Sequence, residues 1–220
     1  MIGMDYLALA NDADFDAALA GGCDLRDELL GLATSQPMSA AGMQRLFELG
    51  VAPRIFGVLH GAGDLAVARV AITSPARGPM LWEPEGTEPR LLVGVREQGV
   101  LVDIVSLSTE NPDSWALRRG AAWCLGHEAF ERCDPAVHWD HAQRLRIQAT
   151  PIDWMRSGGE GICVLDWSVA PHHLRSLGED VQLCCDRGAG AALRGLLRFG
   201  GVPGVREIGP IRPANERRAA

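Results

Sequence analysis

The chain has 220 residues, a hydrophobic content of 47% and a formal net charge of −7 at pH 7. This length fits one large domain or two small ones, and the net negative charge argues against a general nucleic-acid-binding protein. Every basic residue is arginine, so P-loop, Schiff-base and general-base chemistry that needs lysine is excluded.

No apolar run approaches the roughly 18 residues that span a bilayer. The first residues, MIGMDYLALANDADFD, lack a basic start and turn acidic at once, which is not typical of a secretory signal. We therefore expect a soluble, cytoplasmic protein without a membrane contact. The six cysteines are too few for a disulfide scaffold at this length, so reduced thiols are expected.

The N-terminal segment, residues 1–52, is predicted to be helical. Apolar residues recur at helical spacing over residues 24–33 and again over residues 39–50. Each stretch begins with a capping candidate, and the second ends at Gly50.

The next segment changes to short runs rich in β-branched residues, which predicts a small mixed sheet that begins with antiparallel strands. A loop rich in proline and glycine, residues 75–90, separates two of these runs, and 97–99 is a turn candidate. The expected strands cover residues 56–59, 65–72, 91–96 and 99–107.

A helix is predicted from Asn111 to about residue 132, because Asn or Asp can cap it and Pro112 suits its first turn. Strands and helices then alternate with short loops, which predicts a C-terminal βαβα unit with a parallel strand pair and a right-handed crossover. The expected strands are 144–149, 161–166, 181–186 and 205–208, and the expected helices are 151–156, 168–177 and 189–199.

The predicted class is therefore α+β, with a helical N-terminal segment, a small mixed sheet and the C-terminal βαβα unit. The expected organisation is a helical segment at 1–52, an α/β domain at 53–212 and a disordered tail at 213–220.

One candidate site is a metal centre between residues 124 and 141. On the predicted helix Cys124, His127 and Glu131 fall at i, i+3 and i+7, so one face would present all three. Cys133, His138 or His141 could complete a zinc tetrahedron. The spacing matches neither a zincin nor a Cys-x-x-Cys signature. The alternative interpretation is structural, with Cys124 in the core and His127 and Glu131 at a solvated helix end.

A second candidate lies at two strand ends, where Asp166 and Asp186 would meet a ligand beyond the carboxyl edge of a parallel sheet. They could hold a magnesium ion or a ribose, and Gly188 and Gly190 offer bare amides to a phosphate at a helix start. The alternative is that both aspartates only cap helices and the glycines shorten a turn.

A third candidate is an arginine patch with tryptophans. Arg118, Arg119, Arg144 and Arg146 could clamp a phosphate or a nucleic acid locally. The alternative is that the tryptophans belong to the core and the arginines reach into water.

Three sets of segments carry a family resemblance: residues 101–107, residues 115–126, and residues 150–156 with 161–166. Over about residues 90–210 the chain resembles a loosely defined group of uncharacterised proteobacterial proteins, some of them encoded in phage-like gene regions. The resemblance implies an accessory role in a mobile element and assigns no catalytic residue or cofactor.

The sequence therefore predicts a bacterial accessory or interaction protein, non-catalytic, with a protein partner or a second copy of itself. Two alternatives stay open. One is a metal- or phosphate-ligand-binding domain or enzyme that uses Asp166 and Asp186, and the other is a local nucleic-acid contact through the arginines.

Overall fold

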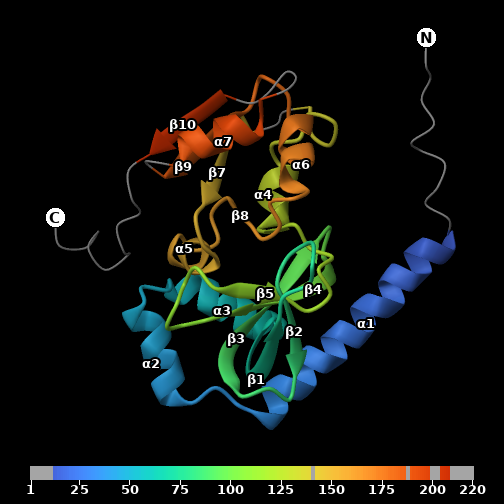
Figure 1. Ribbon diagram of the computed structural model, residues 1–220, viewed down its shortest axis with the longest axis vertical. Coiled ribbons are helices and arrows are strands. Elements are labelled where there is room, and N and C mark those ends of the chain that lie inside the picture. Colours follow the sequence, from blue (N-terminus) through green and yellow to red (C-terminus); the bar gives the residue numbers. More distant parts are fainter. Residues whose placement is uncertain (1–11, 140–141, 187–188, 199–203, 209–220) are drawn as a thin grey trace.

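The computed structural model describes residues 12–139, 142–186, 189–198 and 204–208. The chain passes from N-terminal helices into a closed five-stranded barrel and then into a five-stranded C-terminal sheet, which lies above the barrel in Figure 1. The predicted α+β class is confirmed. No helix within these described ranges is both long and apolar enough to cross a membrane.

The N-terminal helices are α1 (Asp12–Ser35), α2 (Ala40–Glu48) and α3 (Pro53–Ala62). The first two confirm the predicted helical segment, and the side chain of Ser39 caps α2 by accepting a hydrogen bond from the Gly42 amide at 3.1 Å. Helix α1 runs along the barrel and packs against two of its strands (Figure 1).

Helix α3 replaces the strand predicted at residues 56–59. Pro53 stands in its first turn, and Gly63 ends it in the left-handed conformation at φ 72°. Its buried residues Ile55 and Leu59 are four positions apart, so they lie on one helical face. A short apolar run does not distinguish this face from a strand, which is why the prediction was wrong.

The barrel strands pair in the closed order β1-β2-β5-β4-β3, and every pair is antiparallel except β2 with β5. The predicted small sheet is therefore a barrel without open edges. The five barrel strands are β1 (Leu65–Thr73), β2 (Leu81–Pro84), β3 (Glu88–Glu97), β4 (Val100–Leu107) and β5 (Trp115–Leu117).

Strand β2 lies inside the segment predicted as a loop. Its Trp82 is fully buried, and the indole Nε1 donates a hydrogen bond to the Ile104 carbonyl at 2.9 Å. A buried aromatic ring with a satisfied polar atom fixes this strand against β4. The proline and glycine residues on either side indicate a loop, so the sequence pattern does not predict the strand.

The helix predicted for residues 111–132 is wrong. The segment contains β5, a loop, β6 (Cys124–Leu125) and the short helix α4 (His127–Glu131). The loop between β5 and β6 follows the buried side chain of Asp103, which accepts hydrogen bonds from its backbone amides. A tertiary contact thus overrides a favourable helical pattern.

The C-terminal sheet has the order β10-β9-β7-β8-β6. Its first four strands are mutually parallel and β6 is antiparallel to β8, so the predicted parallel pair is confirmed and extended. The elements are β7 (Arg144–Gln148), α5 (Pro151–Arg156), β8 (Ile162–Val164), α6 (Ala170–Ser176), β9 (Gln182–Asp186), α7 (Gly190–Leu196) and β10 (Gly204–Ile208).

One buried cluster joins the barrel to this sheet. It contains Leu59 of α3, Val93 of β3, Trp154 of α5 and Cys163 of β8, so α5 and the barrel cover one face of the sheet. A second cluster covers the other face with residues of α4, α6 and α7, and a third packs α1 on the barrel.

Candidate functional site

The connections of the C-terminal sheet diverge between β7 and β9. The chain leaves β7 through α5 to β8 on one side, and then crosses through α6 to β9 on the other side of β7. Helix α5 lies on one face and α6 and α7 on the other. In open parallel sheets, ligands bind outside the carboxyl ends of the strands at such a switch point.

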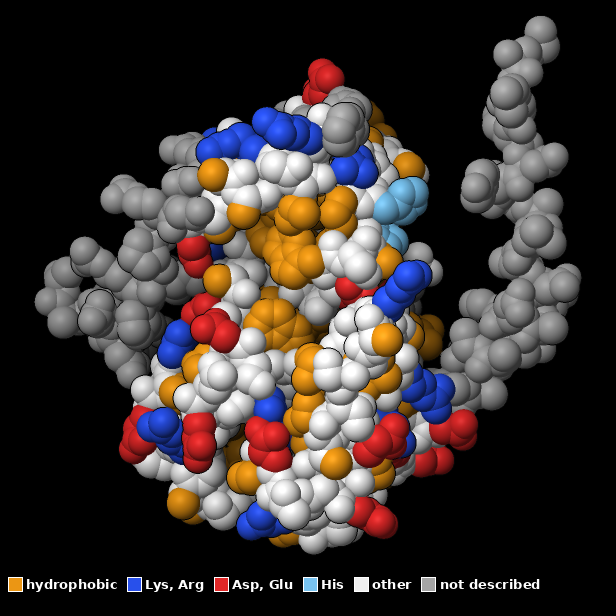
Figure 2. All heavy atoms as spheres, viewed as in Figure 1, with side chains coloured by type: hydrophobic (Ala, Val, Ile, Leu, Met, Phe, Trp, Pro, Cys, Tyr) orange, Lys and Arg blue, Asp and Glu red, His pale blue; other side chains and the backbone are white. Residues whose placement is uncertain are grey.

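A pocket of about 280 Å³ opens at this point. It lies between the carboxyl ends of β7 and β9, helix α7 and the loop after β8. Figure 2 shows hydrophobic side chains gathered in the upper half of the face in view, the half that holds the C-terminal elements. The residues that line the pocket are Ile147, Gln148, Ala149, Trp167, Cys185, Asp186, Ala189, Ala192, Leu193 and Leu196.

Asp186 is the one acidic residue among these lining positions. Its Oδ1 is buried and has no hydrogen-bond partner within the described part of the chain, and burial raises the pKa of its carboxyl while Arg146 opposes that rise. The expected capping role is not observed, because Ala189 stands at the N-cap of α7 and no side chain caps that helix. The carboxyl group therefore lacks a structural explanation of its own.

Gln148 supplies a second buried acceptor at the same pocket. Its side chain is almost fully buried, and its Nε2 donates to the Glu160 carbonyl at 3.0 Å. Its Oε1 has no hydrogen-bond partner among the described residues. The pocket is thus apolar, with two lining residues that carry unpartnered acceptors.

Asp166 does not join Asp186. It follows β8, and β7 lies between β8 and β9, so the two strand ends are about 10 Å apart. The Asp166 Oδ1 accepts from the amide and hydroxyl of Ser168 at 2.8 and 2.6 Å, which forms a local turn. It is absent from the pocket lining.

The predicted glycine turn is only partly described. Gly188 lies outside the described residues, and Gly190 is buried at the first position of α7. Helix α7 has seven residues, so its dipole is small. The phosphate role of these glycines stays a prediction.

The predicted metal residues do not share a helix face. Cys124 lies in β6 and is fully buried, and burial raises the pKa of its thiol. His127 and Glu131 do meet, with 3.6 Å between Nδ1 and Oε1, whereas His138 is exposed beyond α4. Within the described ranges no three His, Cys, Asp or Glu side chains are grouped to hold a metal ion.

Glu97, at the end of β3, joins His127 and Glu131 without having been predicted. Its Oε1 is buried and meets no hydrogen-bond partner in the described ranges, and burial raises the pKa of its carboxyl, with His127 opposing and Glu131 adding to the rise. It lies far from both residues in the sequence, so no local pattern could indicate this neighbour.

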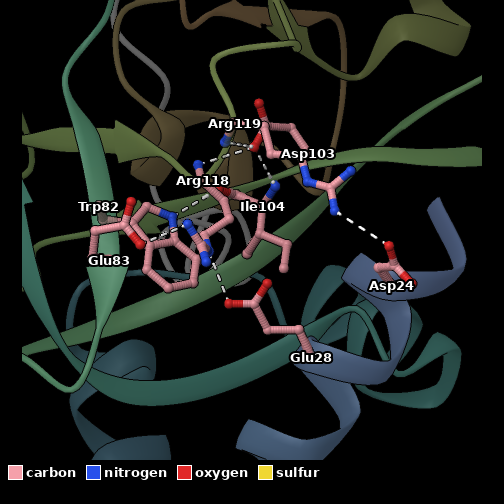
Figure 3. A network of polar contacts seen from close by, with 8 residues as sticks. All are labelled: Asp24, Glu28, Trp82, Glu83, Asp103, Ile104, Arg118 and Arg119. Carbon is pink, nitrogen blue, oxygen red and sulfur yellow. Dashed lines mark hydrogen bonds and ion pairs between the residues drawn. The ribbon is translucent and has the colours of Figure 1, made fainter. Parts of the chain in front are cut away.

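The four candidate arginines lie in two separate places, two in the loop after β5 and two in strand β7. Arg118 forms ion pairs with Glu28 of α1 at 2.8 Å and Glu83 of β2 at 2.9 Å, and its guanidinium lies 5.3 Å from the centre of the Trp82 ring (Figure 3). Arg119 approaches Asp24 at 4.0 Å. This pair fastens α1 to the barrel.

Arg144 and Arg146 belong instead to β7 of the C-terminal sheet. Arg144 is exposed, and Arg146 interacts electrostatically with Asp186. The structure therefore does not form one patch from the four side chains.

Comparison of the chain with protein-family models, curated proteins and solved structures finds no match.

Proposed function

We propose that the protein binds a small planar molecule that donates hydrogen bonds, in the pocket at the carboxyl ends of β7 and β9. One observation carries the proposal. An acidic side chain, Asp186, lines a pocket on the switch point of a parallel sheet, and one of its oxygens is buried without a partner among the residues that the structure describes.

The unpartnered acceptors determine the polarity of the ligand. A buried acceptor without a partner costs about 1–3 kcal/mol, more for a charged group. Asp186 Oδ1 and Gln148 Oε1 are covered in the free protein, so a small side-chain movement must bring them to a ligand N–H group, and the bond formed then removes that cost. A cationic donor would also offset the burial that raises the Asp186 pKa. Amidines and amino-substituted heteroaromatic rings combine these properties.

The pocket walls determine the shape of the ligand. They are formed largely by alanine, leucine and isoleucine, and the partly exposed Trp167 offers an aromatic face to a flat ring. The volume is near the lower end of the range for small-molecule sites, about 300–1,000 Å³. A phosphate is less suitable, because no arginine is among the described lining residues and Asp186 would repel it.

Benzamidine, a planar amidinium compound, is a direct probe. We expect it to raise the melting temperature of the wild-type protein by mass action. The effect should be lost in Asp186→Asn and kept in Asp166→Asn, which removes the strand-end acid that does not line the pocket. No stabilisation of the wild type, or equal stabilisation of all three proteins, would refute the proposal.

A protein-interaction role is the second candidate, and it matches the accessory role implied by the resemblance. The observation in its favour is Trp139, whose surface is 96% exposed beside the exposed Val137. Exposed tryptophans of this kind are enriched among the residues that dominate protein interfaces. If the partner is a second copy, sedimentation velocity should give dimers that Trp139→Ser weakens. A wild-type chain that stays monomeric at every concentration would exclude this form.

A further inference from the structure

A second cleft, separate from the pocket described above, lies where the barrel meets the C-terminal sheet. Its volume is about 330 Å³, and it shares no lining residue with the pocket at Asp186. Its walls come from α3, the turn after α3, β3, α4 and the end of α5. The charged and polar side chains among its lining residues are Arg54, Asp64, Arg96, His127, Glu128 and Arg132.

The cleft is held in shape by close backbone approaches. Gly126 has φ 77°, and a Cβ atom there would lie 2.2 Å from the Gly161 carbonyl oxygen. Gly159 has φ 84°, and its Cβ would lie 2.9 Å from Ile55. The indole of Trp154 is fixed by its hydrogen bond to the Gly161 carbonyl at 3.1 Å. The cleft is therefore formed before any ligand enters.

One of its three arginines is already neutralised. Arg96 binds Asp64 through two parallel hydrogen bonds, from Nε to Oδ2 at 2.7 Å and from Nη2 to Oδ1 at 2.8 Å. Its Nη1 donates to the Gly99 carbonyl at 2.8 Å. This bidentate pair serves as a structural support and leaves little capacity for a ligand.

The other two arginines are not held in ion pairs within the described ranges. Arg54, in the first turn of α3, and Arg132, directly after α4, are both exposed. Glu128 is the remaining acid in the lining and is exposed. The lining side chains thus carry one positive charge in excess, on guanidinium groups from two different elements.

His127 adds a polar ring to the same cleft. Its Nδ1 lies 3.6 Å from Glu131 Oε1, and its ring meets the edge of Trp123 with 6.2 Å between centroids. The neighbouring acids Glu97 and Glu131 would repel a doubly charged anion more than a singly charged one. Below the charges, Ile55, Val58, Leu59 and Trp154 form an apolar floor.

We propose that this cleft binds a small organic monocarboxylate, with its carboxylate between Arg54 and Arg132 and its apolar body against Trp154 and α3. Guanidinium groups suit a carboxylate because their donors match its two oxygens. The excess of one positive charge matches one carboxylate, and the apolar floor requires an organic acid rather than an inorganic ion.

Benzoate, with neutral benzamide as its matched compound, tests the proposal by NMR of glycine-labelled protein. Benzoate should shift the amide signals of Gly94, Gly126, Gly158 and Gly159 in a saturable way, and benzamide should shift them much less. Arg54→Gln and Arg132→Gln should each weaken benzoate binding about two- to fivefold, the range for a partly exposed ion pair.

Arg77→Gln is the control, because Arg77 is exposed in the loop before β2 and does not line the cleft. It should leave the benzoate titration unchanged. The three substituted residues, Arg54, Arg77 and Arg132, are exposed, so the variants should keep the wild-type melting temperature. This separates loss of binding from loss of fold. The proposal fails if benzoate leaves the four glycine signals unmoved, if benzamide moves them equally, or if all three variants behave alike.

Discussion

The Asp103 carboxylate organises the loop after β5, which the local sequence pattern wrongly predicts as helix. It is fully buried, and five backbone amides donate to it. Figure 3 shows those of Ile104, Arg118 and Arg119. The Ile104, Arg118 and Arg119 amides reach Oδ1, and the Ala121 and Ala122 amides reach Oδ2 at 2.7 and 3.2 Å. Both oxygens are thus needed as acceptors.

We expect Asp103→Asn to lower the free energy of unfolding by about 2–4 kcal/mol, because the new NH₂ group must face amides that also donate. Urea denaturation measures this loss. Asp113→Asn removes the same charge from an exposed site and should change the stability by less than about 0.5 kcal/mol. Equal stability of the two variants would show that the amides find other acceptors.

Replacement of the Glu97 carboxylate should stabilise the protein, whereas replacement of the Asp103 carboxylate should destabilise it. Burial raises the pKa of its carboxyl above the unfolded value, so its stability contribution is fully present below the unfolded pKa and is lost as pH rises through the folded pKa. Glu97→Gln should therefore raise the melting temperature at about pH 8, where a histidine imidazole carries little charge, and have little effect at about pH 4.

Calorimetry at the two pH values measures this difference. Glu110→Gln, which neutralises an exposed carboxylate, should show no such pH dependence. A Glu97→Gln protein that is less stable than the wild type at the higher pH would contradict the assigned cause.

Among the elements, helix α3 has two glycines near its end at which alanine should change the stability in opposite directions. Gly61 lies inside the helix, and Gly63 ends it at φ 72°; an added Cβ would meet nothing within 4 Å at either position. Gly61→Ala should raise the free energy of unfolding by about 0.5–1 kcal/mol through helix propensity. Gly63→Ala should lower it by about 1–2 kcal/mol, because alanine is strained in the left-handed conformation.

The two variants are matched controls for each other, since both add one methyl group to open space. Chemical denaturation gives both values. The same sign of change in both would contradict a helix that ends at Gly63 in the left-handed conformation.

The elements that the sequence predicted well have local causes. The Ser39 cap begins α2, and Thr150 caps α5 with its hydroxyl accepting from the Asp153 amide at 3.1 Å. The elements that it did not predict depend on distant partners. Strand β2 needs the contact of Trp82 with Ile104, and the loop after β5 needs Asp103. No window of neighbouring residues contains both members of those contacts.

At the scale of the whole molecule, the candidate pocket depends on strand order. The sequence placed Asp166 and Asp186 correctly at the ends of β8 and β9, but it could not indicate that β7 separates them. That order assigns Asp166 to a local turn and Asp186 to the pocket. Gln148 and Trp167 were missed for the same reason, because they approach Asp186 only through the fold.

The barrel and the C-terminal sheet share one buried core. The pocket at Asp186 lies at the end of the sheet, and the cleft lined by Arg54 and Arg132 lies at the junction with the barrel. The two sites therefore call for ligands of opposite charge, an amidine for the first and a carboxylate for the second. Each probe is a negative control for the other site.

The titration of the Asp186 carboxyl is the most direct test of whether this group is held for a donor ligand. Carbon-13 NMR of aspartate-labelled protein would follow the Asp186 and Asp166 carboxyl signals against pH, with and without benzamidine. We expect the Asp186 pKa to be raised above the ordinary aspartate value in the free protein and to fall when benzamidine binds, while the Asp166 signal does not respond. An Asp186 pKa that benzamidine leaves unchanged would contradict the account.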